Sequence, residues 1–332
     1  MPSSDYSLSL LPHFPVAEKQ PHILTTHNKK RTDHYYWMRD DERKNEKVLA
    51  HLQAENNYCD EQLACIKPLQ NTLFEELKAR IVKDDNSVPV KDGKYWYHSE
   101  VRGDDEYARH YRSTSIKAEN KALLLDVNEL AQDFEFFDLG EVALSPNEQL
   151  MAYSQDTEGR RIYNVRFKNI STGEMLTDEL ENTEGQVVWA NDNKTVFYVK
   201  KDLQTLLGYQ VFRHELGSAQ SQDVLVYEEQ DSSFFMGLGK SRDEALIIID
   251  LASTESNDTW VLDANNPQGQ FSALMQREEG HEFDIDKLGD TFYIVTNWQA
   301  KNFRLMTATE QTIADKTQWQ EHTAHREHVL LE

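Results

Sequence analysis

The stretch ALSPNEQLMAYSQDTEGRRIYNVRFKNISTGE (Ala143–Glu174) decides the fold class, because it holds two short strand patterns and the turns around them. A turn at Ser145–Glu148 precedes the run LMAYS, and a turn through Gly159 precedes IYNVRFKNI. In the second run apolar and polar side chains alternate, as they do in a half-buried strand. One face would carry Tyr163, Val165 and Phe167, and the other Asn164, Arg166 and Lys168.

The same order of turn and strand recurs along the chain at intervals of roughly 50 residues. The runs KYWYH, LMAYS, TVFYV, ALIIID and TFYIVT each follow a turn. Taking Asp92, Pro146, Asp192, Asp243 and Gly289 as markers, the spacings are 54, 46, 51 and 46. Repeats of this length with about four short strands each are typical of a β-propeller, whose blades must stack to bury both faces. A large β-sandwich also has strands at regular spacing and is the alternative at this point.

The length of the repeating region sets the number of blades. Residues 83–332 have room for about five units of roughly 50 residues. The final segment WQEHTAHREHVLLE (Trp319–Glu332) ends on an apolar run without a closing strand or a cap. We therefore expect a mainly β fold in which an incomplete β-propeller occupies residues 83–332.

The N-terminal region, residues 1–82, is assigned as a separate arm, in which residues from about 40 to 81 have a helical pattern. The acids Asp40–Glu42 suit a helix N-terminus, and apolar residues then recur at helical spacing. Pro68 divides the pattern into two helices, because proline is tolerated at a first helical position. The aromatic run Tyr35–Trp37 just before the first helix is suited to pinning the chain against a second body. A packing layer on the propeller itself is the alternative.

Composition excludes several classes of function. The net charge is −23, from 58 acids and 35 bases, so the surface would repel phosphate backbones, and we expect no nucleic-acid partner. The spacing of Cys59 and Cys65 does not match a redox or zinc-binding motif. Both are therefore predicted to be free thiols in a reducing compartment. The N-terminus lacks a basic signal-peptide region, and the aliphatic run Ala245–Ile249 is too short for a membrane span. These features predict a cytoplasmic protein without a membrane partner.

A search for catalytic or metal-binding residues assigns none, and no cofactor is predicted. The nearest approach to the G-x-S-x-G nucleophile turn is GKSRD (Gly239–Asp243), but a strand follows it, so Ser241 is predicted to be a turn residue. The spacing of His322, His325 and His328 does not bring three imidazoles to one point. The triplet Asp104–Glu106 is predicted to be a solvated loop. The sequence has no HExxH motif and no glycine-rich phosphate loop.

The sequence resembles oligopeptidase B, a branch of the prolyl oligopeptidase family of serine peptidases. The stretches RTDHYYWMRDDER and VLAHLQAENNY are similar to the N-terminal arm of that family. Three propeller segments add to the resemblance: Ala143–Glu174, YQVFRHELGSAQSQDVLVYEEQDSSFFMGL (Tyr209–Leu238) and TFYIVTNWQAKNFRLM (Thr291–Met306). The similarity is colinear from about residue 20 to the end of the sequence.

The resemblance implies an N-terminal arm, a seven-bladed propeller and a C-terminal α/β-hydrolase domain with a Ser–Asp–His triad. Such enzymes cleave short peptides after Lys or Arg, the arm packs on the hydrolase domain and the propeller restricts access. Here the sequence departs from the family: it stops inside the propeller, and no triad residue can be carried over. We therefore expect the gating portion of an oligopeptidase B-like endopeptidase, inactive alone, with oligopeptides as the partners of the full-length family. A truncated, split or interrupted gene product would each fit, and pairing with a separately encoded catalytic domain is physically allowed but has no support in the sequence. A free-standing propeller that binds basic peptides is the alternative.

Overall fold

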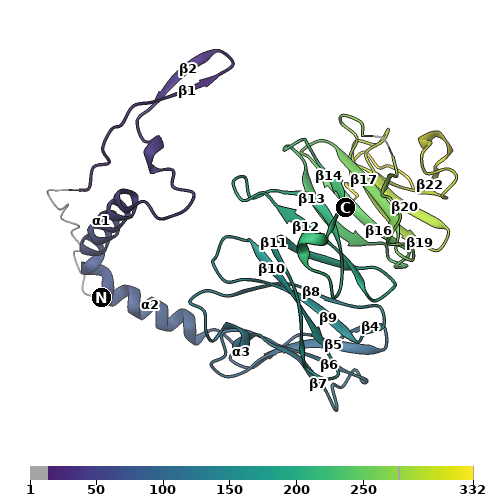
Figure 1. Cartoon of the computed structure of the whole chain (residues 1–332), viewed down its shortest axis with the longest axis horizontal. Coiled ribbons are helices and arrows are strands. Elements are labelled where there is room, and N and C mark those ends of the chain that lie inside the picture. Colours follow the sequence, from purple (N-terminus) through teal and green to yellow (C-terminus); the bar gives the residue numbers. More distant parts are fainter. Residues whose placement is uncertain (1–13, 276, 332) are drawn as a thin grey trace. The chain divides into compact units, whose positions relative to one another are not determined.

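The computed structural model describes residues 14–275 and 277–331. The chain divides into two compact units, Met1–Asp85 and Asn86–Glu332, each of which is described by itself (Figure 1). The first contains two α-helices and a small hairpin, and the second is built of β-sheets.

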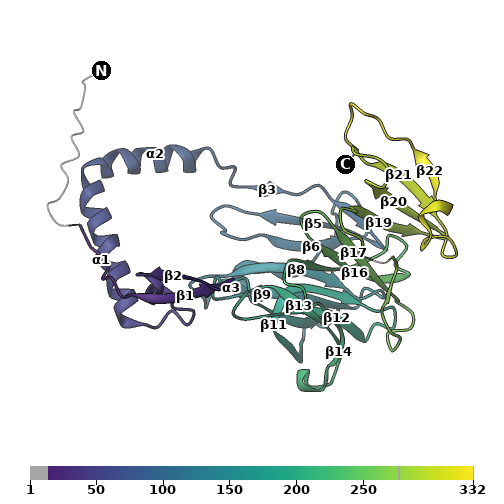
Figure 2. The ribbon, with the colours of Figure 1, turned by 90° about the horizontal axis from the view of Figure 1, so that it is seen from above.

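The first unit contains the two helices expected from the sequence, but the first helix starts later than predicted. The elements are β1 (His22–Thr26), β2 (Lys29–Asp33), η1 (Tyr36–Met38), α1 (Glu46–Leu63), η2 (Ala64–Ile66) and α2 (Lys67–Ala79). Asn45 caps α1, its Oδ1 accepting from Lys47 N at 3.0 Å. Asp40 instead accepts a hydrogen bond from Asn45 N at 2.7 Å, so it shapes the approach to the helix rather than its first turn. The helices meet at η2, with Pro68 in the first turn of α2 (Figure 2).

The aromatic run Tyr35–Trp37 packs partly within this first unit. Tyr36 stacks on His22, with ring centroids 4.1 Å apart. Trp37 donates from Nε1 to Glu18 O at 2.8 Å, and the Lys47 ammonium lies over its ring at 5.0 Å. Tyr35 keeps 44% of its surface exposed. These local contacts account for Tyr36 and Trp37 and leave Tyr35 uncovered by the unit.

The second unit contains five successive blades within the described residues, as expected for a propeller. The first blade comprises β4 (Val90–Asp92), β5 (Tyr95–Val101), β6 (Arg109–Ser113) and β7 (Ala122–Asp126), with β3 (Asp85–Asn86) at the unit boundary and α3 (Val127–Ala131) after it. The second and third blades comprise β8 (Asp138–Leu144), β9 (Leu150–Asp156), β10 (Tyr163–Asn169), β11 (Met175–Trp189), β12 (Thr195–Lys201), β13 (Gly208–Glu215), η3 (Gln220–Gln222) and β14 (Val224–Glu228). The fourth comprises β15 (Phe235–Lys240), β16 (Leu246–Ala252), β17 (Asn257–Asp263) and β18 (Ser272–Ala273). The fifth comprises β19 (Phe283–Leu288), β20 (Thr291–Thr296), β21 (Arg304–Ala308), η4 (Lys316–Gln318) and β22 (Gln320–Thr323).

The second and third blades form one seven-stranded sheet, because β11 belongs to both. Its first half pairs with β10, and its second half pairs with β12. The change of partner occurs around Gly185, whose φ is +103°, a backbone conformation that favours glycine. A register shift between Thr183 and Val187 marks the same point. The long strand therefore bends where the chain passes from one blade to the next.

The core consists of apolar layers between successive blades, and β12 shows how the sequence produces them. All of Thr195–Val199 is buried, without the alternation of a half-exposed strand. Val196 and Tyr198 pack toward the second blade, whereas Phe197 and Val199 pack toward the fourth. A central strand with both faces covered needs a continuous apolar run, which TVFYV supplies. The runs LMAYS, IYNVRFKNI, ALIIID and TFYIVT likewise fall in β9, β10, β16 and β20.

The last blade corrects the expectation that no strand follows Trp319. Gln320–Thr323 forms β22 and pairs with β21. Its first three residues are exposed, as suits the outer strand of a blade, so the sequence has no apolar alternation to reveal it. Trp319 fixes the approach to the strand: it is buried and donates from Nε1 to Ile313 O at 2.9 Å.

Candidate functional site

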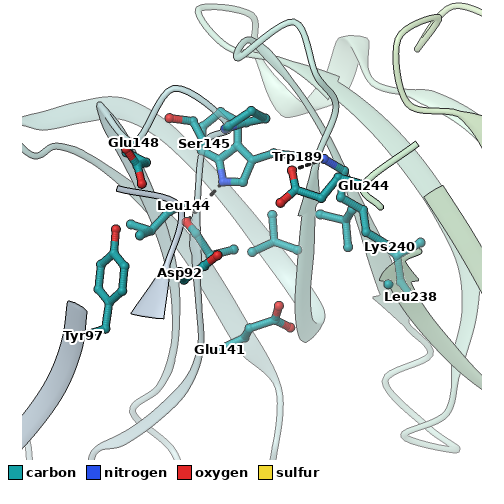
Figure 3. A pocket seen from close by; sticks show the side chains of 16 residues that line it. Asp92, Tyr97, Glu141, Leu144, Ser145, Glu148, Trp189, Leu238, Lys240 and Glu244 are labelled. Atoms are coloured by element: carbon teal, nitrogen blue, oxygen red, sulfur yellow. Dashed lines mark hydrogen bonds and ion pairs between the residues drawn. The ribbon is translucent and has the colours of Figure 1, made fainter. Parts of the chain in front are cut away.

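The strongest candidate site is a cavity of about 290 Å³ that we call the axial pocket, formed where the first strands of four successive blades come together (Figure 3). Its walls come from the β4–β5 turn, the end of β8, the end of β11 and the end of β15. The residues that line it are Asp92, Gly93, Tyr97, Glu141, Ala143, Leu144, Ser145, Pro146, Glu148, Val187, Val188, Trp189, Leu238, Gly239, Lys240 and Glu244. Residues more than 140 positions apart in the sequence thus share one cavity.

The turns beside the pocket repeat one backbone conformation. In each of the five blades, the residue near the tip of the turn between the first two long strands has a φ between +51° and +61°. These residues are Gly93, Glu148, Asn193, Glu244 and Gly289. The left-handed conformation closes a tight turn, and glycine and asparagine adopt it most readily. Glu148 and Glu244 occupy the same structural position in two blades, and both line the pocket.

Hydrogen bonds connect each turn to the next, so the turns hold the blades in register. Lys94 N donates to Glu148 Oε1 at 2.8 Å, across 54 residues, and Asn147 N donates to Asn193 Oδ1 at 2.7 Å, across 46. Between the third and fourth blades, Asn191 Nδ2 donates to Glu244 O at 3.2 Å, across 53 residues. These sequence separations match the spacing of the repeat.

The link between the fourth and fifth blades is made by Asp243. Its Oδ2 accepts from Lys287 Nζ and from Gly289 N, each at 3.0 Å. Its Oδ1 accepts from Ser241 Oγ at 2.7 Å. Burial by itself would raise the pKa of Asp243, but the bonds from Ser241 and Lys287 outweigh burial and lower it to about 2. The carboxylate is therefore a fixed anion of the interblade contact.

The axial pocket is acidic. Asp92, Glu141, Glu148 and Glu244 contribute four carboxyl groups, and Lys240 is the one lysine or arginine that lines it. With all of these groups ionised, two of the four carboxylates are offset by lysines, because Lys94 Nζ lies 3.7 Å from Glu148 Oε2 and Lys240 Nζ lies 3.6 Å from Glu244 Oε2. Glu148 is held by Lys94 N, whereas in Figure 3 the side chains of Asp92, Glu141 and Glu244 surround the open space. Such a cavity favours an ammonium or guanidinium group over a neutral or anionic one.

Burial shifts the pKa of two groups in the pocket. Burial raises the pKa of Glu141, because removing water disfavours the carboxylate. It lowers the pKa of Lys240, whose Nζ donates to Asn191 Oδ1 at 2.7 Å and lies 3.6 Å from Glu244 Oε2. A cationic ligand near Glu141 would replace the lost hydration of that carboxylate.

The pocket lacks the arrangement that nucleophilic catalysis requires. Its serine, Ser145, is buried, and its Oγ donates to Asn147 Oδ1 at 2.7 Å and accepts from Leu150 N at 3.0 Å. No histidine is among the residues that line the pocket. Acyl transfer needs a nucleophile in contact with a base, so the axial pocket is suited to binding rather than to peptide hydrolysis.

The residues that the sequence analysis considered and set aside lie outside this pocket. Ser241 is a buried turn residue bonded to Asp243, as predicted. His322 lies on β22, and His325 and His328 follow it. Asp104–Glu106 lies in the β5–β6 loop, where Asp105 pairs with Arg109. Cys59 and Cys65 are exposed free thiols, as expected.

No motif in the sequence marks Asp92, Glu141, Glu244 or Lys240 as site residues, and Asp92 stands out there only as the turn residue of its repeat. Aligning the repeats on their turns would have placed Glu148 and Glu244 at one structural position, which was an available signal. No comparable signal marks Glu141 or Lys240, because they precede their turns by different distances.

Comparison with known proteins connects this sequence and fold to one family. Residues 15–332 match the family described as prolyl oligopeptidase, N-terminal β-propeller domain. The chain belongs to the prolyl oligopeptidase family. Dipeptidyl aminopeptidase BI of Pseudoxanthomonas mexicana is 42% identical, over 96% of this chain and 46% of that protein. Protease 2 of Moraxella lacunata is 27% identical, over 94% of this chain and 46% of its own length.

Two solved structures of oligopeptidase B have the same architecture over the part that this chain matches. Oligopeptidase B from Leishmania major superposes with a TM-score of 0.90 at 31% identity, covering 98% of this chain and 48% of that one. Oligopeptidase B from Trypanosoma brucei gives a TM-score of 0.85 at 28% identity, covering 95% of this chain and 47% of that one. The chain thus spans about half the length of the relatives it matches. Among the described residues, no helix is long and apolar enough to cross a membrane.

Proposed function

We propose that this chain is the gating portion of an oligopeptidase B-like serine endopeptidase that cleaves short peptides after Lys or Arg. The observation that carries the proposal is the match of residues 15–332 to the family's propeller domain, together with coverage of about half of each relative. The acidic axial pocket supports it, because such a pocket concentrates peptides with basic side chains. Hydrolysis itself is assigned to a hydrolase domain that acts together with residues 1–332.

The first unit supplies a surface for that domain in this proposal. Large apolar side chains of α1 and α2 are exposed, among them Leu49, Leu52, Leu73, Phe74 and Leu77, with exposed fractions of 46–62%. A helix that shows apolar side chains to water gains stability when a partner covers them. We assign this surface to contact with the hydrolase domain. The exposed thiols of Cys59 and Cys65 support a reducing compartment, and we propose the cytoplasm.

The test compares the purified 332-residue chain with a fusion of this chain to the part of dipeptidyl aminopeptidase BI that lies beyond the matched region. We expect the chain alone to leave a chromogenic Arg-linked amide intact and the fusion to hydrolyse it. Turnover by the chain alone, blocked by a serine-directed reagent, would contradict the assignment of the chemistry to another domain. Reading the gene beyond codon 332 for a G-x-S-x-G segment is an independent check.

Dipeptidyl aminopeptidase activity is the second candidate, favoured by the 42% identity to the enzyme of that name. The two activities differ in their need for a free substrate amino terminus. An endopeptidase cleaves after Arg in an N-acetylated peptide, whereas a dipeptidyl aminopeptidase releases a dipeptide only from a free amino end. Acetylated and free peptides of identical sequence, assayed with the complete gene product, distinguish them. Because the fusion carries the relative's own catalytic part, it is not used for this comparison.

A further inference from the structure

A second cavity, of about 490 Å³, adjoins the axial pocket, and we call it the side cavity. It is bordered by β4, β5 and β6 of the first blade and by β8 of the second. Asp92, Tyr97 and Leu144 line both cavities, so the two share a wall. The remaining residues that line the side cavity are Ser87, Val88, Val90, His98, Ser99, His110, Tyr111, Leu124 and Val142.

The side cavity is apolar where the axial pocket is acidic. Val88 and Val90 of the first blade are 82% and 64% exposed, and Val142 of β8 contributes to the facing wall. The titratable side chain of His110 also lines it, and burial lowers the pKa of His110, so the imidazole is neutral near pH 7. The side cavity therefore offers the apolar surface of its valines and leucines, and His98, which also lines it, lies 3.2 Å from the carboxylate of Glu100.

Tyr97 marks the junction of the two cavities. Its hydroxyl is shielded from solvent and has no hydrogen-bond acceptor within reach among the described residues, while the neighbouring Arg112 side chain can only donate to it. Burial, followed by the charge of Glu148, raises the pKa of Tyr97 to about 12, so the phenol keeps its proton near pH 7. A buried hydroxyl without an acceptor is uncommon, and a ligand carbonyl at the junction would supply one.

We propose that the axial pocket and the side cavity together form one peptide-binding site on the propeller, selective for a basic residue adjacent to an apolar one. The axial pocket takes the guanidinium or ammonium group among Asp92, Glu141 and Glu244. The side cavity takes the apolar side chain against Val90 and Val142. Successive side chains of an extended peptide point to opposite sides, which suits two cavities that share a wall. The inference deepens the proposed function, since it specifies which basic peptides the propeller retains.

Direct binding to the purified 332-residue chain tests the proposal without requiring catalysis. The probes are three fluorescent tetrapeptides, blocked at both ends, with Leu-Arg, Ser-Arg or Leu-Gln at the centre, and fluorescence anisotropy gives each Kd. We expect Leu-Arg to bind at least tenfold more tightly than either of the others. Raising the salt concentration should weaken both Arg peptides and leave Leu-Gln unchanged, because exposed charges are screened.

Two variants, each with a matched control, test which cavity binds the basic side chain and which binds the apolar one. Glu244→Gln should weaken Leu-Arg and Ser-Arg several-fold without affecting Leu-Gln. Its control is Glu215→Gln, since Glu215 also forms an exposed glutamate–lysine pair, with Lys194. Val90→Ser should weaken Leu-Arg and Leu-Gln but not Ser-Arg, and Val224→Ser, at an exposed valine of the outer strand β14, is its control.

Three outcomes would overturn the proposal: equal affinity for the three peptides, no binding at millimolar peptide, or site variants that behave like their controls. Circular dichroism and melting curves of each variant exclude misfolding as the cause of a lost signal. Failure here would leave the peptidase assignment intact, because hydrolysis by the fusion is measured separately. Conversely, selective binding by the chain with no hydrolysis by the fusion would support a binding module and contradict the peptidase proposal.

Discussion

At the scale of single residues, Gly185 and His214 show most directly how this propeller is held together. Gly185 lies in the middle of β11, where the strand leaves the second blade for the third, with φ at +103°. A Cβ atom at this position would lie 3.0 Å from Tyr163 Cδ2 and 3.3 Å from Ser154 Oγ. Both the backbone conformation and the close approach of Tyr163 therefore require glycine.

Replacing Gly185 by alanine should destabilise the chain more than the same change at a glycine with open surroundings. We expect Gly185→Ala to lower the free energy of unfolding by about 3 kcal/mol, from backbone strain and displacement of Tyr163. Gly217→Ala is the control, because Gly217 has φ at +90° and no atom within 4 Å of its added Cβ. Its cost should be about 1 kcal/mol. Equal losses in urea unfolding would show that the contact with Tyr163 is unimportant.

His214 joins two carboxylates at the border of the second and third blades. Its Nδ1 lies 2.7 Å from Asp223 Oδ1, and its Nε2 lies 3.2 Å from Asp178 Oδ1. All three side chains are at least 95% buried. Burial alone would lower the pKa of His214, but the two aspartates outweigh burial and raise it. The imidazole therefore remains a cation, with both ring nitrogens donating, into a higher pH range than usual.

The pH dependence of stability follows from this raised pKa. The contribution of His214 is fully present below its unfolded pKa of about 6.5 and is lost as pH rises through the folded value. We expect the wild-type free energy of unfolding to fall more steeply above pH 7 than that of His214→Gln, which should itself be less stable by about 3 kcal/mol near pH 6. Urea titrations from pH 5 to 9 measure both. His322→Gln, on the exposed strand β22, should retain the wild-type slope.

At the scale of elements, both the strands and the turns between them hold one blade against the next. Each blade buries its faces against its neighbours, and the turn-to-turn bonds fix how far one blade is displaced along the next. Asp243 has the largest share of these bonds, since it joins its own turn to Lys287 and Gly289 of the next blade. Loss of its charge should loosen the fifth blade first.

Asp243→Asn should lower the free energy of unfolding at pH 7 by about 2 kcal/mol, because bonds to a charged acceptor become bonds to a neutral one. The native pKa of Asp243 is lowered to about 2, so the carboxylate's contribution is present above about pH 4 and is lost as pH falls toward 2. The difference between variant and wild type should therefore shrink over that range. Asp290→Ala, in the exposed β19–β20 turn, should cost under about 0.5 kcal/mol. A loss at Asp290 as large as at Asp243 would contradict this account.

The cap of α1 gives a second test at this scale. Asn45 accepts from Lys47 N at 3.0 Å and from Val48 N at 3.4 Å, pairing two amides of the first turn. Asn45→Ala should destabilise α1 by about 1 kcal/mol and speed amide exchange in its first turn. Asn57→Ala, in the middle of the same helix, should leave exchange unchanged or slower, because alanine favours helices. Faster exchange in both variants would contradict an effect that is specific to the cap.

At the scale of the whole molecule, the two units differ in how far they bury their apolar side chains. The second unit buries apolar layers between its blades, whereas the first leaves apolar faces of α1 and α2 exposed. The net charge of −23 favours repulsion between copies of the chain, which opposes association through these faces. The first unit thus has the character of a contact surface, in keeping with the proposed hydrolase partner.

Substituting the exposed face of α2 tests that role. Leu73→Ser combined with Leu77→Ser should leave the melting of the second unit unchanged, because both residues are about half exposed in the first unit. It should weaken binding of the isolated chain to the catalytic part of dipeptidyl aminopeptidase BI at least tenfold, as measured by sedimentation. Leu225→Ser, at a leucine of β14 that is 45% exposed, is the control. Unchanged binding by the double variant would remove α2 from the proposed interface.

The sequence by itself determined central strands of the five blades, the repeat and the two helices, because apolar periodicity and turn residues act over a few neighbouring positions. It missed β22, whose exposed polar residues have no apolar pattern, and it placed the start of α1 too early because Asp40 resembles a cap. Only the tertiary structure decided the axial pocket: Asp92, Glu141 and Glu244 come together because successive blades turn their first strands toward one cavity. These residues are about 50 or more positions apart in the sequence and come together only because the blades pack against each other. Local sequence patterns involve a few neighbouring positions and therefore do not reveal this proximity.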